Sequence, residues 1–274
     1  MSDANVLDRD RLSVLTGGLI LGLALGRLVE VPVRPFAMSV LGSLVGVNIS
    51  AASLMALLMG SLGITAAESL VRSHPRNRGG RLPQTFMYWI VPGLLMLALA
   101  AWLQTAANLA QWMAGLAAAA VLAPLALAAE YAAVSREERG RSWLQWSQMA
   151  LIYLVAGLLF VRIFDLRARS LLSATAVLLV AGLLAARLFW TTGLRPRLAL
   201  LYGLVPGLAA GQMTWVLNYW RLSGLQGGLL LFMLFYVVTG LCQQYLSGRF
   251  GRQVVIEYVG VGLLALLGIA LWAR

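Results

Sequence analysis

Residues 88–94 (YWIVPGL) return almost unchanged as residues 202–208 (YGLVPGL), and each copy opens a long apolar stretch. The apolar stretch that follows ends in Glu130-Tyr131 after the first copy and in Gln244-Tyr245 after the second, at the same offset. Self-similarity at a fixed spacing is typical of a chain that contains an internal duplication. The sequence therefore predicts that one helical unit occurs twice.

The composition indicates a membrane protein. Hydrophobic residues make up 61% of the chain and charged residues 11%, and a soluble domain could not cover so much apolar surface with polar atoms. The apolar runs are continuous and about 20 residues long, which is the length that an α-helix needs to cross a bilayer. This continuity excludes an outer-membrane barrel, whose strands alternate polar and apolar residues.

We expect an all-α membrane protein with nine transmembrane helices, at about residues 12–30, 50–71, 85–105, 110–132, 144–164, 171–191, 197–217, 226–246 and 254–273. One N-terminal helix precedes two four-helix repeats. Because four is an even number, the two repeats enter the membrane in the same direction and have parallel orientation. The predicted domains are residues 1–49 (N-terminal helix and interfacial segment), 50–167 (first repeat) and 168–274 (second repeat).

Residues 31–49 do not fit the pattern of helical spans. Pro32 and Pro35 break a helix at its start. The stretch from Pro32 to Val71 is too long for one span and too short for two spans with a loop. We expect residues 31–49 to form an interfacial or re-entrant piece on the outer face of the membrane.

The positive charges indicate the orientation. The net charge of +11 comes from arginine, because the chain contains no lysine. With the N-terminus inside, the cytoplasmic segments hold twice as many arginines as the opposite segments. This bias predicts a multi-pass protein of the bacterial cytoplasmic membrane with its C-terminus outside. The arginines lie mostly in short loops, so we expect membrane lipids as partners and no nucleic acid.

Pro92 and Pro206 occupy matching places in the two copies, each followed by glycine. A proline inside a helix removes a backbone hydrogen bond and frees a carbonyl group, which must find a partner in protein or in a water-lined cavity. Matched interruptions in two repeats predict a binding site at the repeat interface. The alternative is that both prolines only bend the helices for packing.

Polar residues near the cytoplasmic ends of the spans could supply that site. The candidate ligand-binding residues, in addition to the two prolines, are Tyr88, Glu130, Tyr202, Gln244 and Glu257. Carboxylates inside membrane spans are typical of sites for a cation, a proton or a basic group. The alternative is that the tyrosines belong to the interfacial belt and the glutamates reach water at helix ends.

Gly18, Gly22 and Gly26 form a smooth face at helical spacing in the first predicted span. Such a face lets another helix approach closely. One interpretation is docking onto the protein's own bundle, with Gly203, Gly207 and Gly211 as the internal partner. The other is a homodimer seam or a contact with another membrane subunit.

Enzymatic motifs are not evident. The chain has one cysteine, Cys242, and one histidine, His74, so an internal disulfide and bis-histidine haem ligation are excluded. The absence of lysine excludes Schiff-base chemistry with retinal or pyridoxal phosphate. We expect no catalytic residues, no metal site and no cofactor, and an enzyme is the less favoured class.

Several short motifs resemble an uncharacterised family of multi-pass membrane proteins found in green non-sulfur bacteria and similar lineages. They are the Arg72-Ser73-His74-Pro75 turn, Glu130-Tyr131, Gly211-Gln212 with Trp215, Phe235-Tyr236 and Glu257-Tyr258. The resemblance covers most of the chain and supports the layout of nine spans. It implies no activity, because none is assigned to that family.

Three functions are compatible with these observations. The first is binding or transport of a small or lipid-like molecule at the repeat interface. The second is a non-catalytic structural subunit of a larger membrane complex. The third is a membrane enzyme that acts on a lipid or isoprenoid substrate, with Glu257 or Glu130 as acid and base.

Overall fold

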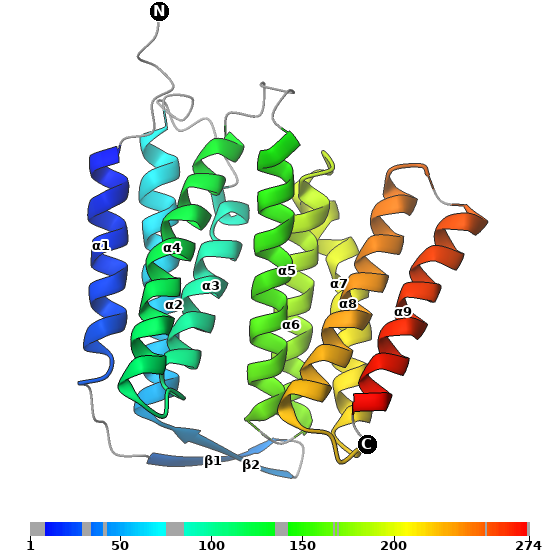
Figure 1. Ribbon diagram of the computed structural model, residues 1–274, viewed down its shortest axis with the longest axis horizontal. Helices are drawn as coiled ribbons and strands as arrows, with labels where there is room; N and C mark the ends of the chain where they lie inside the picture. Colours follow the sequence, from blue (N-terminus) through cyan, green and yellow to red (C-terminus); the bar gives the residue numbers. More distant parts are fainter. Residues whose placement is uncertain are drawn as a thin grey trace, which may run out of the picture. The chain divides into compact units, whose positions relative to one another are not determined.

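The computed structural model describes residues 9–28, 34–40, 43–74, 85–134, 142–166, 168, 170–249 and 251–272. Over these residues the chain forms nine α-helices, one 3₁₀ helix and one β-hairpin (Figure 1). The elements are α1 (Arg9–Leu25), β1 (Arg34–Val40), β2 (Ser43–Ile49), α2 (Ala51–Ser73), η2 (Thr85–Tyr88), α3 (Ile90–Leu103), α4 (Leu109–Val134), α5 (Ser142–Asp165), α6 (Ser170–Trp190), α7 (Pro196–Leu217), α8 (Gly224–Leu246) and α9 (Arg252–Trp272).

The helices lie where the apolar runs predict them. Seven helical segments of the described part are long and apolar enough to cross a membrane: α2, η2 with α3, and α4 to α8. The chain is therefore a membrane-embedded protein. α1 has 17 residues, which is shorter than the roughly 20 residues that a span needs. That α1 and α9 also cross the membrane stays a prediction.

The β-hairpin departs from the expected all-α fold. β1 and β2 pair antiparallel, from Arg34 opposite Ile49 to Val40 opposite Ser43. Pro35 excludes a regular helix at the start of this segment but is tolerated near the beginning of an edge strand. Antiparallel pairing satisfies the backbone groups that a broken helix would leave open. The segment was expected to be interfacial or re-entrant, and its strand structure was not foreseen.

The chain divides into two compact units, residues 1–148 (unit 1) and residues 149–274 (unit 2). Unit 1 contains the hairpin and the helices α1 to α4, and unit 2 contains most of α5 and the helices α6 to α9. The division falls inside α5 and follows packing. The predicted boundary after residue 167 rests on the predicted internal repeat rather than on packing, and it stays a prediction.

In unit 1, α1 packs against α2 and α4, while α2 and α3 form the most extensive helix pair. Successive helices run in alternate directions. The end of α1, the start of α2, the end of α3 and the start of α4 therefore share one end of the unit, where the hairpin also lies (Figure 1). We call this the hairpin end of unit 1.

Glycines let α2 and α3 cross closely. A Cβ atom built at Gly63 would lie 2.7 Å from the carbonyl oxygen of Pro92, and one built at Gly60 would lie 3.3 Å from that of Gly93. A Cβ atom at Gly93 would meet Cγ1 of Ile64 at 2.7 Å. In lipid, where burial of apolar side chains gives little gain, such backbone proximity stabilises helix pairs by van der Waals packing.

In unit 2, α6 and α7 form the corresponding close pair. A Cβ atom at Gly203 would lie 2.6 Å from the carbonyl oxygen of Gly182, and one at Gly207 would lie 2.8 Å from that of Leu178. A Cβ atom at Gly211 would lie 3.1 Å from the carbonyl oxygen of Ala174. The predicted contact of these three glycines with the first helix is wrong, because they face α6 of their own unit.

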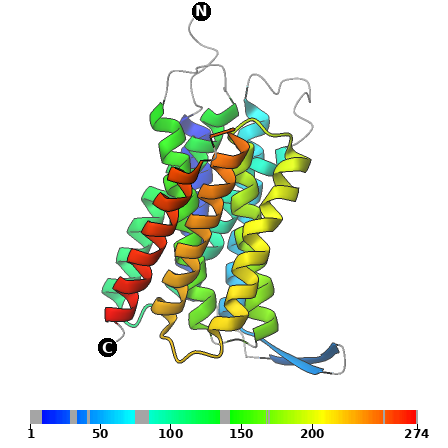
Figure 2. The ribbon, with the colours of Figure 1, turned by 90° about the vertical axis from the view of Figure 1, so that its right-hand side faces the viewer.

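α8 contacts both α5 and α9 in unit 2, and Figure 2 shows α8 and α9 side by side. A side chain at Gly228 would overlap the backbone of Val161 in α5. One at Gly240 would overlap the ring of Tyr258 in α9. The small residues of α8 thus determine how closely both neighbouring helices approach it.

Two helices begin with a reciprocal cap. The Ser50 hydroxyl accepts from the backbone N–H of Ser53 at 3.2 Å, and the Ser53 hydroxyl accepts from the backbone N–H of Ser50 at 3.0 Å. Ser223 and Gln226 make the same exchange at the start of α8. Each exchange satisfies two backbone donors that a helix N-terminus would leave open.

Candidate ligand-binding site

The sequence-predicted site residues divide between the two units. Unit 1 contains Tyr88, Pro92 and Glu130, and unit 2 contains Tyr202, Pro206, Gln244 and Glu257. A single site at the repeat interface would combine both groups, and it stays a prediction.

The two matched prolines have different local structures. Pro92 is the third residue of α3, where a backbone N–H would have no partner inside the helix, so the proline costs no hydrogen bond. Pro206 lies inside α7, where it removes a backbone bond. A third proline, Pro124, lies inside α4. The duplicated motif therefore contains one interior proline rather than two equivalent kinks.

The matched tyrosines also differ in exposure. Tyr88 belongs to the 3₁₀ turn before α3 and is 4% exposed, whereas Tyr202 in α7 is 36% exposed. The 3₁₀ turn has no counterpart in α7, which is continuous through this position. The same tyrosine thus packs into the core of unit 1 and lies at the surface of unit 2.

Glu130 lies near the end of α4 and is only 2% exposed. The next residue, Tyr131, packs against His74, with ring centroids 4.6 Å apart. His74 caps the end of α2 and is 1% exposed. A buried carboxylate and a buried imidazole are therefore found in unit 1, at the end opposite the hairpin.

In unit 2, Gln244 makes a side-chain hydrogen bond with Tyr258. The ring of Tyr258 lies 5.7 Å from that of Tyr236, and the Tyr153 hydroxyl lies 3.2 Å from that of Thr239. Glu257 is exposed. Gln244 thus belongs to a hydroxyl-rich seam that joins α8 to its neighbours, and Glu257 points away from the interior of unit 2.

The predicted glycine face of the first helix packs in part against α2 of the same unit. A Cβ atom at Gly22 would lie 3.0 Å from the Met59 sulfur, and one at Gly26 would lie 2.8 Å from Cε of Met55. A Cβ atom at Gly18 would meet nothing within 4 Å. Two of the three glycines therefore lie against methionines of α2, and the third is open.

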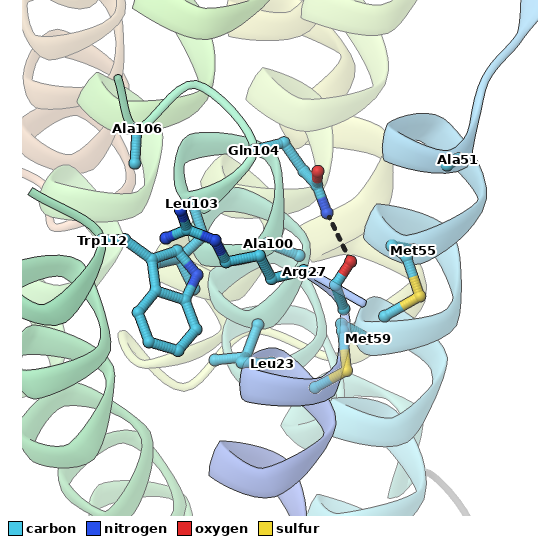
Figure 3. Close-up of a pocket in the computed structure, with 11 residues that line it drawn as sticks. Leu23, Arg27, Ala51, Met55, Met59, Ala100, Leu103, Gln104, Ala106 and Trp112 are labelled. Atoms are coloured by element: carbon cyan, nitrogen blue, oxygen red, sulfur yellow. Dashed lines mark hydrogen bonds between the residues drawn. The ribbon is translucent and has the colours of Figure 1, made fainter. Parts of the chain in front are cut away.

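A cavity of about 360 Å³ opens at the hairpin end of unit 1 (Figure 3). It lies among the end of α1, the first turns of α2, the end of α3 and the start of α4. Its lining consists of Leu23, Gly26, Arg27, Ala51, Met55, Met59, Ala100, Leu103, Gln104, Ala106 and Trp112. Its volume falls within the range of about 300–1,000 Å³ that is typical of small-molecule sites.

One wall of the cavity carries its polar groups. The guanidinium carbon of Arg27 lies 5.3 Å from the centre of the Trp112 ring, as a cation–π pair. The side-chain amide of Gln104 donates to the carbonyl oxygen of Gly26 at 3.4 Å (Figure 3). Arg27, Trp112 and Gln104 come from three different segments, so this polar wall exists only in the folded unit.

The opposite wall is apolar and polarisable. Met55 and Met59 extend from α2 toward the end of α1 (Figure 3), where Leu23 is buried. Methionine side chains fill irregular spaces and adapt to different partners. The cavity thus combines a cationic, aromatic rim with an apolar wall.

The local sequence explains why Arg27 lies at the rim. α1 ends at Leu25, and the N–H of Gly26 still donates to the carbonyl oxygen of Gly22 at 3.1 Å. Gly26 leaves room for Met55, so the chain passes close to α2 before it leaves the helix. Arg27 is the first exposed residue after this approach.

Sequence reasoning did not identify this site. Arg27 is one of the arginines of the predicted outer segments, whose number served only to predict the orientation. The sequence feature that could have indicated the site is a charged residue, Arg27, directly after a glycine at the end of an apolar stretch. Convergence of Arg27 with Gln104 and Trp112 depends on helix packing, which the sequence pattern does not give.

Metal ligands do not gather in the part of the chain that the structure describes: no group of three or more histidine, cysteine, aspartate or glutamate side chains could hold an ion there.

The chain was compared with known proteins. No curated protein and no solved structure matches it. A family model described as a protein of unknown function (DUF5656) matches residues 31–272. The match agrees with the resemblance to a family without an assigned activity. It covers the hairpin and the helices α2 to α9 but not α1, and it matches more than half of the chain, so the chain belongs to the DUF5656 family of proteins of unknown function.

Proposed function

We propose that this membrane protein binds a lipid-like, amphiphilic molecule in the cavity at the hairpin end of unit 1. The observation that carries the proposal is the opposition of Arg27 and Trp112 to the apolar wall of Met55 and Met59 in one cavity. A ligand with one polar end and one apolar part would match both walls. A purely polar ligand would leave Met55 and Met59 in contact with water. A purely apolar ligand would remove Arg27 from water without offering it a hydrogen-bond acceptor.

The position of the cavity supports a ligand from the bilayer. It lies among the ends of four helices at the hairpin end of unit 1, and Trp and Arg are typical of the level of the lipid headgroups. In the proposed topology, with the N-terminus inside a bacterial cytoplasmic membrane, α1 ends on the outer side. The cavity would then open toward the outer leaflet. The twofold excess of arginine in the predicted cytoplasmic segments supports this orientation.

An internal duplication with parallel repeats is part of this proposal. Gly60 of α2 and Gly182 of α6 are matched in sequence, as are Gly93 of α3 and Gly207 of α7. Both matched pairs lie at the crossing of their helices. Equivalent crossings in units 1 and 2 support a common origin, and transporters built from repeats are frequent in membranes. Transport of the bound molecule is therefore the natural extension of binding.

A subunit role is the second candidate. Gly18 has open space around it, and Val14 and Leu21 of the same helix are strongly exposed. A partner helix could pack on this part of α1, because glycine allows close approach in lipid. Gly18→Leu should then remove a partner that co-purifies from native membranes. An unchanged set of co-purified proteins would count against the subunit role.

A cavity-filling variant tests the binding proposal. Ala106 lies at the cavity rim in the connection between α3 and α4 (Figure 3). The next residue, Ala107, is exposed and does not line the cavity. Ala106→Phe should fill the cavity, and Ala107→Phe is the matched control. The readout is covalent labelling by two photoactivatable lipids, a diacylglycerol and a phosphatidylglycerol, followed by identification of the labelled peptides.

The expected result is saturable labelling of peptides from the start of α2 and the end of α3. Ala106→Phe should reduce it about tenfold, which corresponds to about 1.4 kcal/mol of binding free energy. Ala107→Phe should leave it unchanged. Labelling that does not saturate, or that Ala106→Phe does not reduce for either lipid, would rule out this site.

A further inference from the structure

Among the described residues that line the cavity, Arg27 carries the one charged side chain, and none is a carboxylate. We infer that the bound molecule is an anionic glycerophospholipid whose phosphate group is held by Arg27. This inference rests on the proposed function, because it names the chemical class of the ligand of the same cavity.

The pair with Trp112 holds Arg27 at the rim of the cavity. The guanidinium carbon lies over the indole ring, 5.3 Å from its centre. A guanidinium group carries N–H donors in a planar fork, and two parallel donors match two oxygens of a phosphate group. Because the contact with Trp112 already limits the movement of Arg27, less ordering is needed on binding.

The helix ends around the cavity do not determine the sign of the ligand's charge. α2 and α4 begin there and bring the positive ends of their dipoles, while α1 and α3 end there and bring the negative ends. These opposite contributions are of similar size and largely cancel. The carbonyl group of Gly26, directly after the end of α1, already accepts from Gln104. The charge of Arg27 therefore decides in favour of an anion.

The apolar wall distinguishes a lipid from a soluble phosphate. Met55, Met59 and Leu23 continue from the rim of the cavity toward the middle of α1 and α2. An acyl chain attached to the phosphate would lie along them and remove apolar surface from water. A soluble phosphate would contact Arg27 alone.

The test uses the full chain in neutral maltoside detergent, with the two photoactivatable lipids named above. They differ in the phosphoglycerol headgroup, which only the phosphatidylglycerol probe carries. The wild-type protein should be labelled by phosphatidylglycerol at about tenfold lower probe concentration than by diacylglycerol, because a charge-assisted bidentate pair adds to the apolar contact. Arg27→Gln should abolish this preference.

Two further variants keep the test interpretable. Arg221→Gln removes an exposed arginine of unit 2 and should leave the preference unchanged. Arg27→Lys keeps the charge but loses the planar fork, so its preference should be intermediate. Each variant is compared by its elution profile and helical circular dichroism before labelling.

The outcomes separate the inference from the proposed function. If Arg27→Gln leaves the preference intact while Ala106→Phe abolishes labelling by both lipids, the phosphate inference is wrong and lipid binding stands. If Ala106→Phe has no effect on either probe, the proposed function fails. If soluble glycerol phosphate competes as strongly as phosphatidylglycerol, the ligand is a soluble phosphate and the lipid assignment is overturned.

Discussion

The helix pairs α2–α3 and α6–α7 cross at matched glycines but achieve the crossing in different ways. In unit 2, Gly203 and Gly207 place the backbone of α7 directly against the backbone of α6. In unit 1, Gly93 faces the side chain of Ile64, and the position that matches Gly203 is Trp89. The same motif can therefore support either a contact with backbone or a contact with a side chain that can move.

Trp89 gives unit 1 an anchor that glycine cannot provide. Its indole N–H donates to the Glu68 carboxylate at 2.6 Å, and the same carboxylate accepts from Arg72. The pair α2–α3 is thus joined by a hydrogen bond to a charged group as well as by packing. The pair α6–α7 relies on backbone proximity over the three glycines of α7.

The polar residues that follow α3 and α7 also make different contacts in the two units. Gln104 and Asn218 follow α3 and α7 at matched positions. Asn218 donates to the hydroxyl of Ser173 in α6 at 2.9 Å and so joins the two helices of its own pair. Gln104 instead reaches the carbonyl of Gly26 beyond α1. The extra helix of unit 1 thus redirects this amide toward the cavity.

The largest expected effect comes from Gly203→Ala. The added Cβ atom would lie 2.6 Å from a backbone oxygen, so the helices must separate. We expect a loss of about 3 kcal/mol in the free energy of unfolding, at the upper end of typical overpacking costs. Unfolding by denaturant in detergent measures it. Gly182→Ala, whose Cβ atom would meet its nearest atom at 3.6 Å, is the control and should be neutral or stabilising.

The second effect is that of Trp89→Phe. The phenyl ring keeps most of the packing but loses the donor to Glu68. Hydrogen bonds to charged groups contribute about 1.5–3 kcal/mol, and Arg72 still pairs with the carboxylate, so we expect a loss of about 1.5 kcal/mol. Gly203→Phe at the matched position should be far more disruptive. Equal effects of both substitutions would contradict the difference between the two crossings.

The third effect is smaller, and a second substitution should relieve most of it. Gly93→Ala would bring Cβ against Cγ1 of Ile64, which can move, so we expect a loss of about 1 kcal/mol. Ala186 stands in α6 where Ile64 stands in α2, four residues after the matched glycine. In a double-mutant cycle, Ile64→Ala should therefore relieve most of the cost of Gly93→Ala. Additive costs would show that Ile64 is not the obstacle.

The smallest effects concern the caps of the helices. Ser50→Ala and Ser223→Ala each remove one exposed reciprocal cap, with an expected loss of about 0.5–1 kcal/mol. The two losses should be similar, because the caps have the same geometry in both units. Thermal unfolding with matched protein concentrations checks this. A loss in one unit only would indicate that its helix start is fixed by tertiary contacts instead.

The sequence by itself determined the helices and their order. Continuous apolar runs of spanning length leave a helix as the structure that satisfies its own backbone groups in lipid, and the repeated YxxVPGL motif marked two equivalent places. It also supplied the glycines at which the helices cross. The strands β1 and β2 were not foreseen, because prolines exclude a helix without selecting the alternative.

The tertiary structure alone decided what the matched residues do. Pro92 falls in the first turn of its helix and Pro206 inside its own, because η2 precedes α3 and nothing comparable interrupts α7. Arg27, Gln104 and Trp112 share one cavity because α1 packs on α2 and α4. Such convergence depends on helix crossings, which are set by contacts between residues far apart in the chain, and a hydrophobic pattern read along the sequence carries no information on them.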